Sequence, residues 1–300
     1  MQQYCITQEN LIFILFTFFF QPMKTLFGSP LRCARTSRAV VLSSVCLFIA
    51  LACSSCFLNF NSFDVISGNG NVITRERQIA AFSKIENATQ ADIDITTKGT
   101  QKVELRTDEN LHEYFITEVT GGKLRIYTRS GTNISTVRGV RFTISMPSLE
   151  EVSNSGSGDI TVSPLESSTF ALTNSGSGDV NLSKIKGETF TLTNNGSGDI
   201  DLKELVVQSL TARLNGSGSL TAQGTANTGK LETFGSGDIR ARNTTFQEAT
   251  AQTSGSGGIT LSVVQKLDAT TRGSGDITYY GNPPNITRTT TGSGRVSRGN

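Results

Sequence analysis

The chain has 300 residues and a formal net charge of +2. Residues 1–56 carry four basic side chains and one acidic side chain, a net of +3, which leaves about −1 on residues 57–300. A near-neutral chain without a basic run lacks the positive surface that nucleic-acid binding requires, so we expect no nucleic-acid partner. All five cysteines lie within residues 1–56, which excludes disulfides and thiolate metal sites from the rest of the chain.

The first residues are typical of a secretory leader. Three arginines between residues 32 and 38 precede an apolar run of 14 residues, Ala39–Ala52. Such a run is too short to cross a bilayer as a helix, but it has the length of the apolar part of a signal peptide. We therefore predict a leader over residues 1–56. Met23, followed by Lys24, is also a natural translation start, in which case residues 1–22 are an extension that does not belong to the protein.

The end of the apolar run resembles a bacterial lipobox. It reads Leu51-Ala52-Cys53, small residues followed by a cysteine. In a lipobox the cysteine is acylated and becomes the new N-terminus, so we predict lipidation at Cys53 and a membrane as partner through that lipid. Cys56 is the alternative acceptor, because Ala50 stands where a lipobox usually has leucine. A plain cleaved signal peptide and an uncut membrane anchor are the other interpretations.

The next residues predict a tether followed by irregular strands. Residues 57–71 are rich in Asn, Ser and Gly, a composition typical of linkers. Residues 72–148 contain several segments of alternating polar and apolar residues, and Gly121-Gly122 between two of them indicates a hairpin or a tight corner. We expect residues 72–148 to form irregular β coils that cap a larger β structure. A separate small β domain is the alternative.

A repeat dominates residues 149–300. The tripeptide Gly-Ser-Gly occurs eight times at intervals of 18 to 20 residues, and aspartate follows it in five cases. The tripeptides begin at Gly156, Gly176, Gly196, Gly216, Gly235, Gly255, Gly273 and Gly292. A period of this length indicates structural repeats that stack on one another.

Each repeat contains short alternating stretches such as Asp199-Ile200-Asp201-Leu202. Period-two alternation rich in threonine and β-branched residues predicts strands with one buried face. Stacking the repeats places like residues in columns, for example Ile160, Val180 and Ile200. The predicted fold is therefore all-β, a parallel β-helix (β-solenoid) with coils of about 20 residues. The glycines are expected at corners that need a positive φ or a close backbone approach.

The aspartates after the glycines form a column that is the weak candidate for a metal site. Asp159, Asp179 and Asp199 would lie one strand spacing apart, and calcium could relieve their repulsion with oxygen ligands. Ser219 and Gly258 interrupt the column, however. Aspartates beside glycine commonly bond local backbone groups. We therefore favour solvated, turn-capping aspartates over calcium, and we expect no other metal or cofactor.

Catalytic chemistry finds little support in the sequence. A strand rather than a helix follows each Gly-Ser-Gly, which argues against a phosphate-binding loop. The carboxylates of Asp199 and Asp201 follow the repeat without an Arg, Lys or His cluster nearby, and His112 has no ligand-spaced partner and is expected on the surface. We predict no catalytic or cofactor-binding residue and no enzyme. A polysaccharide-active β-helix enzyme is kept as an alternative.

Several segments carry a resemblance to a known family. Ala91-Asp92-Ile93-Asp94-Ile95, Gly122-Lys123-Leu124-Arg125-Ile126 and Pro147-Ser148-Leu149-Glu150 lead into the Gly-Ser-Gly-Asp repeats. Together they resemble the putative auto-transporter adhesin, head GIN domain family, which is common among lipoproteins of Bacteroidetes. The similarity covers residue 79 to the C-terminus. It implies a right-handed parallel β-helix over residues 72–300 at the cell envelope, and it supplies no catalytic motif.

We therefore expect this chain to function by binding another molecule. The leading hypothesis is a non-enzymatic outer-membrane lipoprotein, facing the periplasm or the cell surface, that acts as an adhesin by binding a glycan or a protein. A structural envelope protein without a specific ligand is the alternative. The chain stops partway through a repeat, so Arg295 and Arg298 either blunt an open solenoid end or line a contact in a homo-oligomer.

Overall fold

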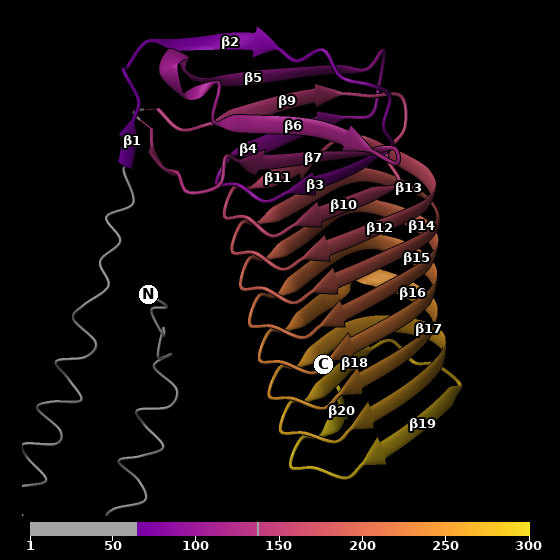
Figure 1. Cartoon of the computed structure of the whole chain (residues 1–300). Helices are drawn as coiled ribbons and strands as arrows, with labels where there is room; N and C mark the ends of the chain where they lie inside the picture. Colours follow the sequence, from indigo (N-terminus) through magenta and orange to yellow (C-terminus); the bar gives the residue numbers. More distant parts are fainter. Residues whose placement is uncertain (1–64, 137) are drawn as a thin grey trace, which may run out of the picture. The chain divides into compact units, whose positions relative to one another are not determined.

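The repeats fold as the coils of a parallel β-solenoid, which confirms the predicted fold class. The computed structural model describes residues 65–136 and 138–300. Figure 1 shows the coils stacked along one axis, from the early strands to the C-terminal strands. After the short strands β10 (Glu151–Asn154) and β11 (Ile160–Val162), each coil contributes one long strand that pairs in parallel with the next. The long strands are β12 (Leu165–Asn174), β13 (Val180–Asn194), β14 (Ile200–Leu214), β15 (Leu220–Thr233), β16 (Ile239–Thr253) and β17 (Ile259–Thr271).

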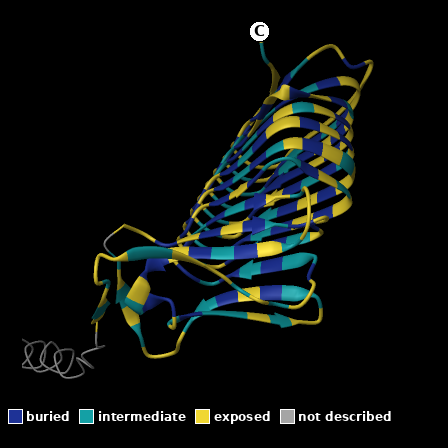
Figure 2. Cartoon of the chain, turned by 90° about the horizontal axis from the view of Figure 1, so that it is seen from above, coloured by how far each residue is buried: buried dark blue, intermediate teal, exposed yellow. Residues whose placement is uncertain are grey.

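The register of the strands follows the sequence repeat. Val180 pairs with Ile160 on one side and with Ile200 on the other, and all three side chains are buried. The column continues through Leu220, Ile239, Ile259 and Ile277. Successive side chains of a strand point to opposite faces, which gives the alternation of buried and exposed positions along each coil in Figure 2. The core is therefore a stack of like residues inside the solenoid.

Each long strand also turns a corner of the coil. In β13 and β14 the corner lies at Lys184 and Glu204, whose φ angles of 52° and 55° are in the left-handed region. Residues other than glycine adopt this region rarely. The apolar residues that follow, Ile185 and Leu205, pair with each other and are fully buried. Burial of these neighbours stabilises the corner against its backbone strain.

The early strands extend the parallel ladder by further turns. β3 (Lys84–Asn87) pairs with β10, and β4 (Asp92–Thr96) pairs with β11. On their other side, β7 (Lys123–Thr128) pairs with β3 and β9 (Arg141–Ser145) pairs with β4, again in parallel. Residues 84–145 thus continue the same sheet as the repeats.

Antiparallel strands then close this end of the sheet. β5 (Lys102–Asp108) lies between β9 and β2 (Val72–Glu76), and it is antiparallel to both. β6 (Phe115–Thr120) forms an antiparallel hairpin with β7. Gly121 and Gly122 join them with φ angles of 58° and 73°, so of the two alternatives expected here, a hairpin or a tight corner, the hairpin is the one formed. We refer to β2–β9 as the cap.

Two further strands lie at the beginning of the described chain and in the cap. β1 (Val65–Ser67) pairs in parallel with β8 (Asn133–Ser135) in a separate two-stranded sheet. β1 falls within the segment 57–71 that was expected to be a tether, so this end of the segment belongs to the folded unit. The leader, with Cys53 and Cys56, lies outside the described residues. Among residues 65–136 and 138–300, no helix has the length and apolar character to span a membrane.

The C-terminal coil ends in short strands. β18 (Ile277–Tyr280) and β19 (Asn285–Thr290) pair with β17, and β20 (Val296–Arg298) pairs with β18. All six residues of β19 are exposed. In the described part of the chain no strand covers the outer edge of β19 or β20. The roles suggested for Arg295 and Arg298 at this end stay predictions.

Candidate functional site

The Gly-Ser-Gly turns lie where consecutive coils approach most closely. A Cβ atom on Gly196 would overlap the carbonyl oxygen of Gly176 in the preceding coil. The N–H of Ser197 donates to that same oxygen at 3.1 Å. None of the Gly-Ser-Gly glycines has a φ in the left-handed region. Of the two reasons expected for glycine here, the close backbone approach is therefore the one that applies.

A row of buried polar side chains supports these turns from inside. Asn194 is fully buried; its Nδ2 donates to the carbonyl of Gly198 at 2.7 Å, and its Oδ1 accepts the N–H of Gly196 at 3.2 Å. In later coils threonine has the same role, as where Oγ1 of Thr253 donates to the carbonyl of Gly257 at 2.8 Å. The row comprises Asn87, Asn154, Asn174, Asn194, Thr233, Thr253 and Thr271. These bonds add to the backbone bonds of the turns, since the N–H of Gly196 also donates to the carbonyl of Asn174 at 3.2 Å, and they supply donors to carbonyls at the ends of the turns.

The aspartate column lies outside the same turns and binds backbone. Oδ1 of Asp159 accepts the N–H of Asp179 at 2.8 Å, and Oδ1 of Asp179 accepts the N–H of Asp199 at 2.7 Å. Asp199 in turn accepts the N–H of Ser219 at 2.7 Å. Each carboxylate thus caps the next coil. In residues 65–136 and 138–300 no cluster of three or more His, Cys, Asp or Glu is arranged to hold a metal ion, and calcium binding stays a prediction.

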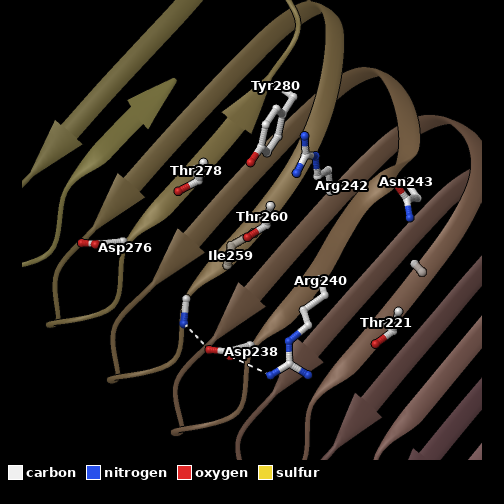
Figure 3. A pocket seen from close by; sticks show the side chains of 12 residues that line it. Thr221, Asp238, Arg240, Arg242, Asn243, Ile259, Thr260, Asp276, Thr278 and Tyr280 are labelled. Carbon is white, nitrogen blue, oxygen red and sulfur yellow. Dashed lines mark hydrogen bonds and ion pairs between the residues drawn. The ribbon is translucent and has the colours of Figure 1, made fainter. Parts of the chain in front are cut away.

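The repeat is interrupted most strongly between β15 and β18. Gly258 replaces the aspartate of the column, and residues 242–244 of β16 have no partners in β17, because Ala241 pairs with Leu261 and Thr245 with Ser262. A groove of about 440 Å³ lies over this interruption (Figure 3). We call it the Gly258 groove. Its polar lining consists of Thr221, Asp238, Arg240, Arg242, Asn243, Thr260, Asp276, Thr278 and Tyr280.

Charged groups of both signs line the Gly258 groove. Nη2 of Arg240 lies 2.9 Å from Oδ2 of Asp238. The guanidinium of Arg242 lies over the ring of Tyr280, 4.1 Å from its centroid. Oδ1 of Asp276 accepts the N–H of Arg295 at 2.7 Å. The lining includes neither histidine nor cysteine, and it offers hydrogen-bond donors and acceptors rather than a nucleophile with its base.

The residues weighed for catalysis do not form a common site. Asp199 belongs to the aspartate column, and Oδ2 of Asp201 lies 3.8 Å from Nζ of Lys203. His112 was expected on the surface, and this was wrong, because only 3% of it is exposed. It follows the 3-10 turn η2 (Glu109–Leu111), which directs the chain into the cap. Burial lowers the pKa of His112 below its usual range.

A protein-family model matches most of the described chain. The model described as "Putative auto-transporter adhesin, head GIN domain" matches residues 81–189 and 171–283. Together the two matches span more than half of the chain. The chain belongs to this family. The resemblance seen in the sequence is thereby confirmed for the head GIN domain.

Solved structures of similar proteins share the fold of this chain. A protein from Parabacteroides distasonis ATCC 8503, named a putative lipid binding protein, is 30% identical over 79% of this chain and 100% of its own, with a TM-score of 0.74. A putative adhesin from Parabacteroides merdae ATCC 43184 is 24% identical over 79% of this chain and 100% of its own, with a TM-score of 0.73. A putative adhesin from Bacteroides fragilis NCTC 9343 is 24% identical over 78% of this chain and 99% of its own, with a TM-score of 0.62. No curated protein is detectably similar in sequence, and none of the three names is that of an enzyme.

Sequence reasoning on this head GIN chain missed two features. The buried row could have been found from the Asn or Thr that stands two residues before most Gly-Ser-Gly turns, with Leu214 as the exception. The Gly258 groove had weaker signals in the sequence. These were glycine in place of aspartate, the short interval of 18 residues between Gly255 and Gly273, and the outward-facing pair Arg240 and Arg242.

Proposed function

We propose that this chain is a non-enzymatic binding module of the bacterial cell envelope, an adhesin that holds a glycan or protein ligand in the Gly258 groove. The supporting observation is that several irregularities coincide at one place, although the register also shifts between β14 and β15. Glycine replaces the column aspartate, β16 bulges at residues 242–244, and Arg242 lies on Tyr280 at the same place. Departures from a local pattern concentrate at functional sites, because a repeat that only needs to stack has no reason to depart from its pattern.

The composition of the groove favours a polar ligand over a lipid chain. One relative is named a lipid-binding protein, and an acyl chain would need apolar walls. The apolar residues of the lining, Ala222 and Ile259, are at most 1% exposed and belong to the core. Threonine hydroxyls, an amide and charged groups remain for contact with a ligand, and these match the hydroxyls of a sugar or the polar groups of a protein.

The proposal is tested with the unit Phe63–Asn300, because a similar share of the chain, 79%, matches the whole chain of a crystallised relative. The unit is screened against immobilised glycans and extracellular proteins, with and without calcium. We expect saturable binding that Arg242→Gln weakens. Arg213→Gln is the matched control, because Arg213 also lies on an aromatic ring, Phe234, at 4.3 Å, but outside the groove.

Four results would contradict parts of this proposal. Equal weakening by both arginine variants would place the ligand elsewhere. Turnover of a polysaccharide would show an enzyme. If a folded, β-rich unit binds no ligand, the alternative of a structural envelope protein is favoured. If binding requires calcium, the aspartate column becomes a candidate metal site again.

Attachment to the membrane is a separate part of the proposal. The full chain is expressed in a Bacteroidetes host with a labelled fatty acid, and label is expected on the wild type but not on Cys53→Ser. Loss of label with Cys56→Ser instead would identify Cys56 as the acceptor. Label on neither the wild type nor the variants would overturn lipidation. Digestion of intact cells with protease then separates a surface-facing from a periplasmic protein.

A further inference from the structure

The interruption at Gly258 removes one acceptor from the aspartate column. The N–H of Gly258 keeps its bond to Oδ1 of Asp238, at 2.9 Å. Glycine has no side chain, however, so it cannot accept the N–H of Asp276 in the next coil. In the regular coils this acceptor is a carboxylate, as with Asp179 and Asp199. The column therefore has a backbone donor at Asp276 that faces the position of a missing carboxylate.

Packing at this position is tight but does not exclude a side chain. A Cβ atom on Gly258 would lie 3.8 Å from Oδ1 of Asp238 and 3.2 Å from the carbonyl oxygen of Asp276, which would have to shift by a few tenths of an ångström. A Cβ atom on the neighbouring Gly257 would instead overlap the carbonyl oxygen of Gly237. Asp238, Gly258 and Asp276 all line the groove, so the space beside Gly258, between the two aspartates, is part of it. We call this space the Gly258 gap.

The surroundings of the gap can accept a carboxylate. Asp159, Asp179 and Asp199 show that carboxylates stack on consecutive coils when each one accepts a backbone N–H. The groove adds the guanidinium groups of Arg240 and Arg242. Arginine is well suited to carboxylate recognition because its planar fork donates paired hydrogen bonds. A ligand carboxylate would thus take the place that an aspartate has in other coils.

The remainder of the groove favours a sugar as the carrier of that carboxylate. The outward-facing Thr221, Thr260 and Thr278 belong to three different coils, and Asn243 adds an amide at the bulge. Hydroxyls and amides both donate and accept, as sugar hydroxyls do. An acidic peptide would gain little from apolar contacts here, because the apolar lining residues are buried in the core.

We infer that the Gly258 gap binds the carboxylate of a uronic-acid sugar in an acidic polysaccharide. One carboxylate oxygen accepts the N–H of Asp276, and the positive charges of Arg240, which is paired with Asp238, and of Arg242, which lies over Tyr280, belong to the same groove. This inference rests on the proposed function and names the ligand class of the same groove. In addition, the ligand's carboxylate takes the role that an aspartate side chain has at the equivalent position of the regular coils.

The test measures binding of the unit Phe63–Asn300 to polygalacturonate, to its methyl ester and to polyglutamate by calorimetry. Loss of a charge-assisted hydrogen bond weakens binding by about tenfold to a hundredfold. We expect a loss of this size for the methyl ester and for Arg242→Gln. Gly258→Asp should abolish binding, because it places the column's own carboxylate in the gap, and circular dichroism of the variant checks that the unit remains folded.

A matched control separates the site from the column. Asp179→Gly opens a similar gap in a regular coil without the groove arginines, and it should leave the affinity for polygalacturonate unchanged. Equal binding of the acid and its ester would overturn the carboxylate assignment while leaving a glycan-binding function intact. Polyglutamate binding as tight as polygalacturonate would overturn the sugar assignment. Unchanged binding by Gly258→Asp, or binding abolished by a calcium chelator, would overturn the direct contact at the gap.

Discussion

Apart from β8, the strands of the cap belong to the same sheet as the regular coils, but the two regions are held together by different kinds of contact. In the coils from β12 to β14 the same contacts recur one repeat apart, so every inward residue packs between two equivalents of itself. The cap relies on contacts that occur once, such as the ion pairs of Arg141 with Asp92 and Asp94 at 3.1 and 2.7 Å. A change in the coils therefore affects two neighbouring coils, whereas a change in the cap can remain local.

The largest expected effect is a charge in the apolar column. Ile200 is fully buried between Val180 and Leu220. Ile200→Asp should destabilise the unit Phe63–Asn300 by about 5 kcal/mol, because it removes apolar burial and places a carboxylate without partners in the core. Thermal melting followed by circular dichroism measures this. The outward neighbour provides the control, since Asp201→Asn should change little; equal effects of the two variants would mean that the column is not the core.

A smaller effect is expected where two coils touch through glycine. Gly196→Val forces a side chain into the carbonyl of Gly176 and should cost about 3 kcal/mol through displacement of the turn. Ser197 is exposed, and Ser197→Ala should lie within about 0.5 kcal/mol of the wild type. Chemical denaturation of the two variants gives the comparison. A greater loss for Ser197→Ala would show that the turn depends on its hydroxyl instead of on close approach.

The buried polar row gives the next effect in size. Asn194→Ala removes the 2.7 Å bond to the Gly198 carbonyl and one of the two acceptors of the Gly196 N–H, and it should cost about 2 kcal/mol. Leu214 occupies the equivalent position one coil later. Leu214→Asn is therefore the informative companion, and denaturation midpoints should show it to be near neutral. Strong destabilisation by Leu214→Asn together with no loss for Asn194→Ala would show that the row contributes only packing.

These contrasts explain which parts of the structure were accessible from the sequence. The solenoid was predictable because its sequence pattern recurs in every coil. Each column of equivalent residues, such as Ile160, Val180 and Ile200, shows several times which side chains point into the core. The glycine pair at residues 121 and 122 likewise predicted its hairpin from local chemistry alone. Both signals depend on spacing or on backbone preference, which sequence reports directly.

The features that were missed depend on partners distant in the chain. His112 was expected on the surface, since nothing near it in sequence shows that β2, 35 residues or more earlier, covers it. The Gly258 groove combines residues from β15 to β18 whose alignment requires the bulge in β16, and the bulge is visible only from the pairing. Features that occur only once in the chain, such as the burial of His112 and the Gly258 groove, were therefore found from the structure.

His112 offers a test of whether the cap loosens separately from the coils. Its Nε2 lies 3.3 Å from the carbonyl oxygen of Ile73, and its Nδ1 has no hydrogen-bond partner among the described residues. A proton on Nδ1 would be buried without an acceptor and near Arg75 and Arg77, whereas Glu109 opposes this effect only in part. The pKa of His112 is accordingly lowered by burial.

The sign of the pH dependence follows from that shift. Because the folded pKa lies below that of the unfolded chain, the unfolded state binds the proton first as the pH falls below about 6.5. The contribution of neutral His112 is present above this pH and is lost as the pH falls through the folded pKa, by at most about 1.4 kcal/mol per pH unit. Hydrogen exchange, corrected for intrinsic rates, should show lower protection of β2 and β5 at pH 5.5 than at pH 7, with β13 and β14 unchanged. His112→Gln should remove the difference; an equal loss in the coils would mean that the cap and the solenoid open as one unit.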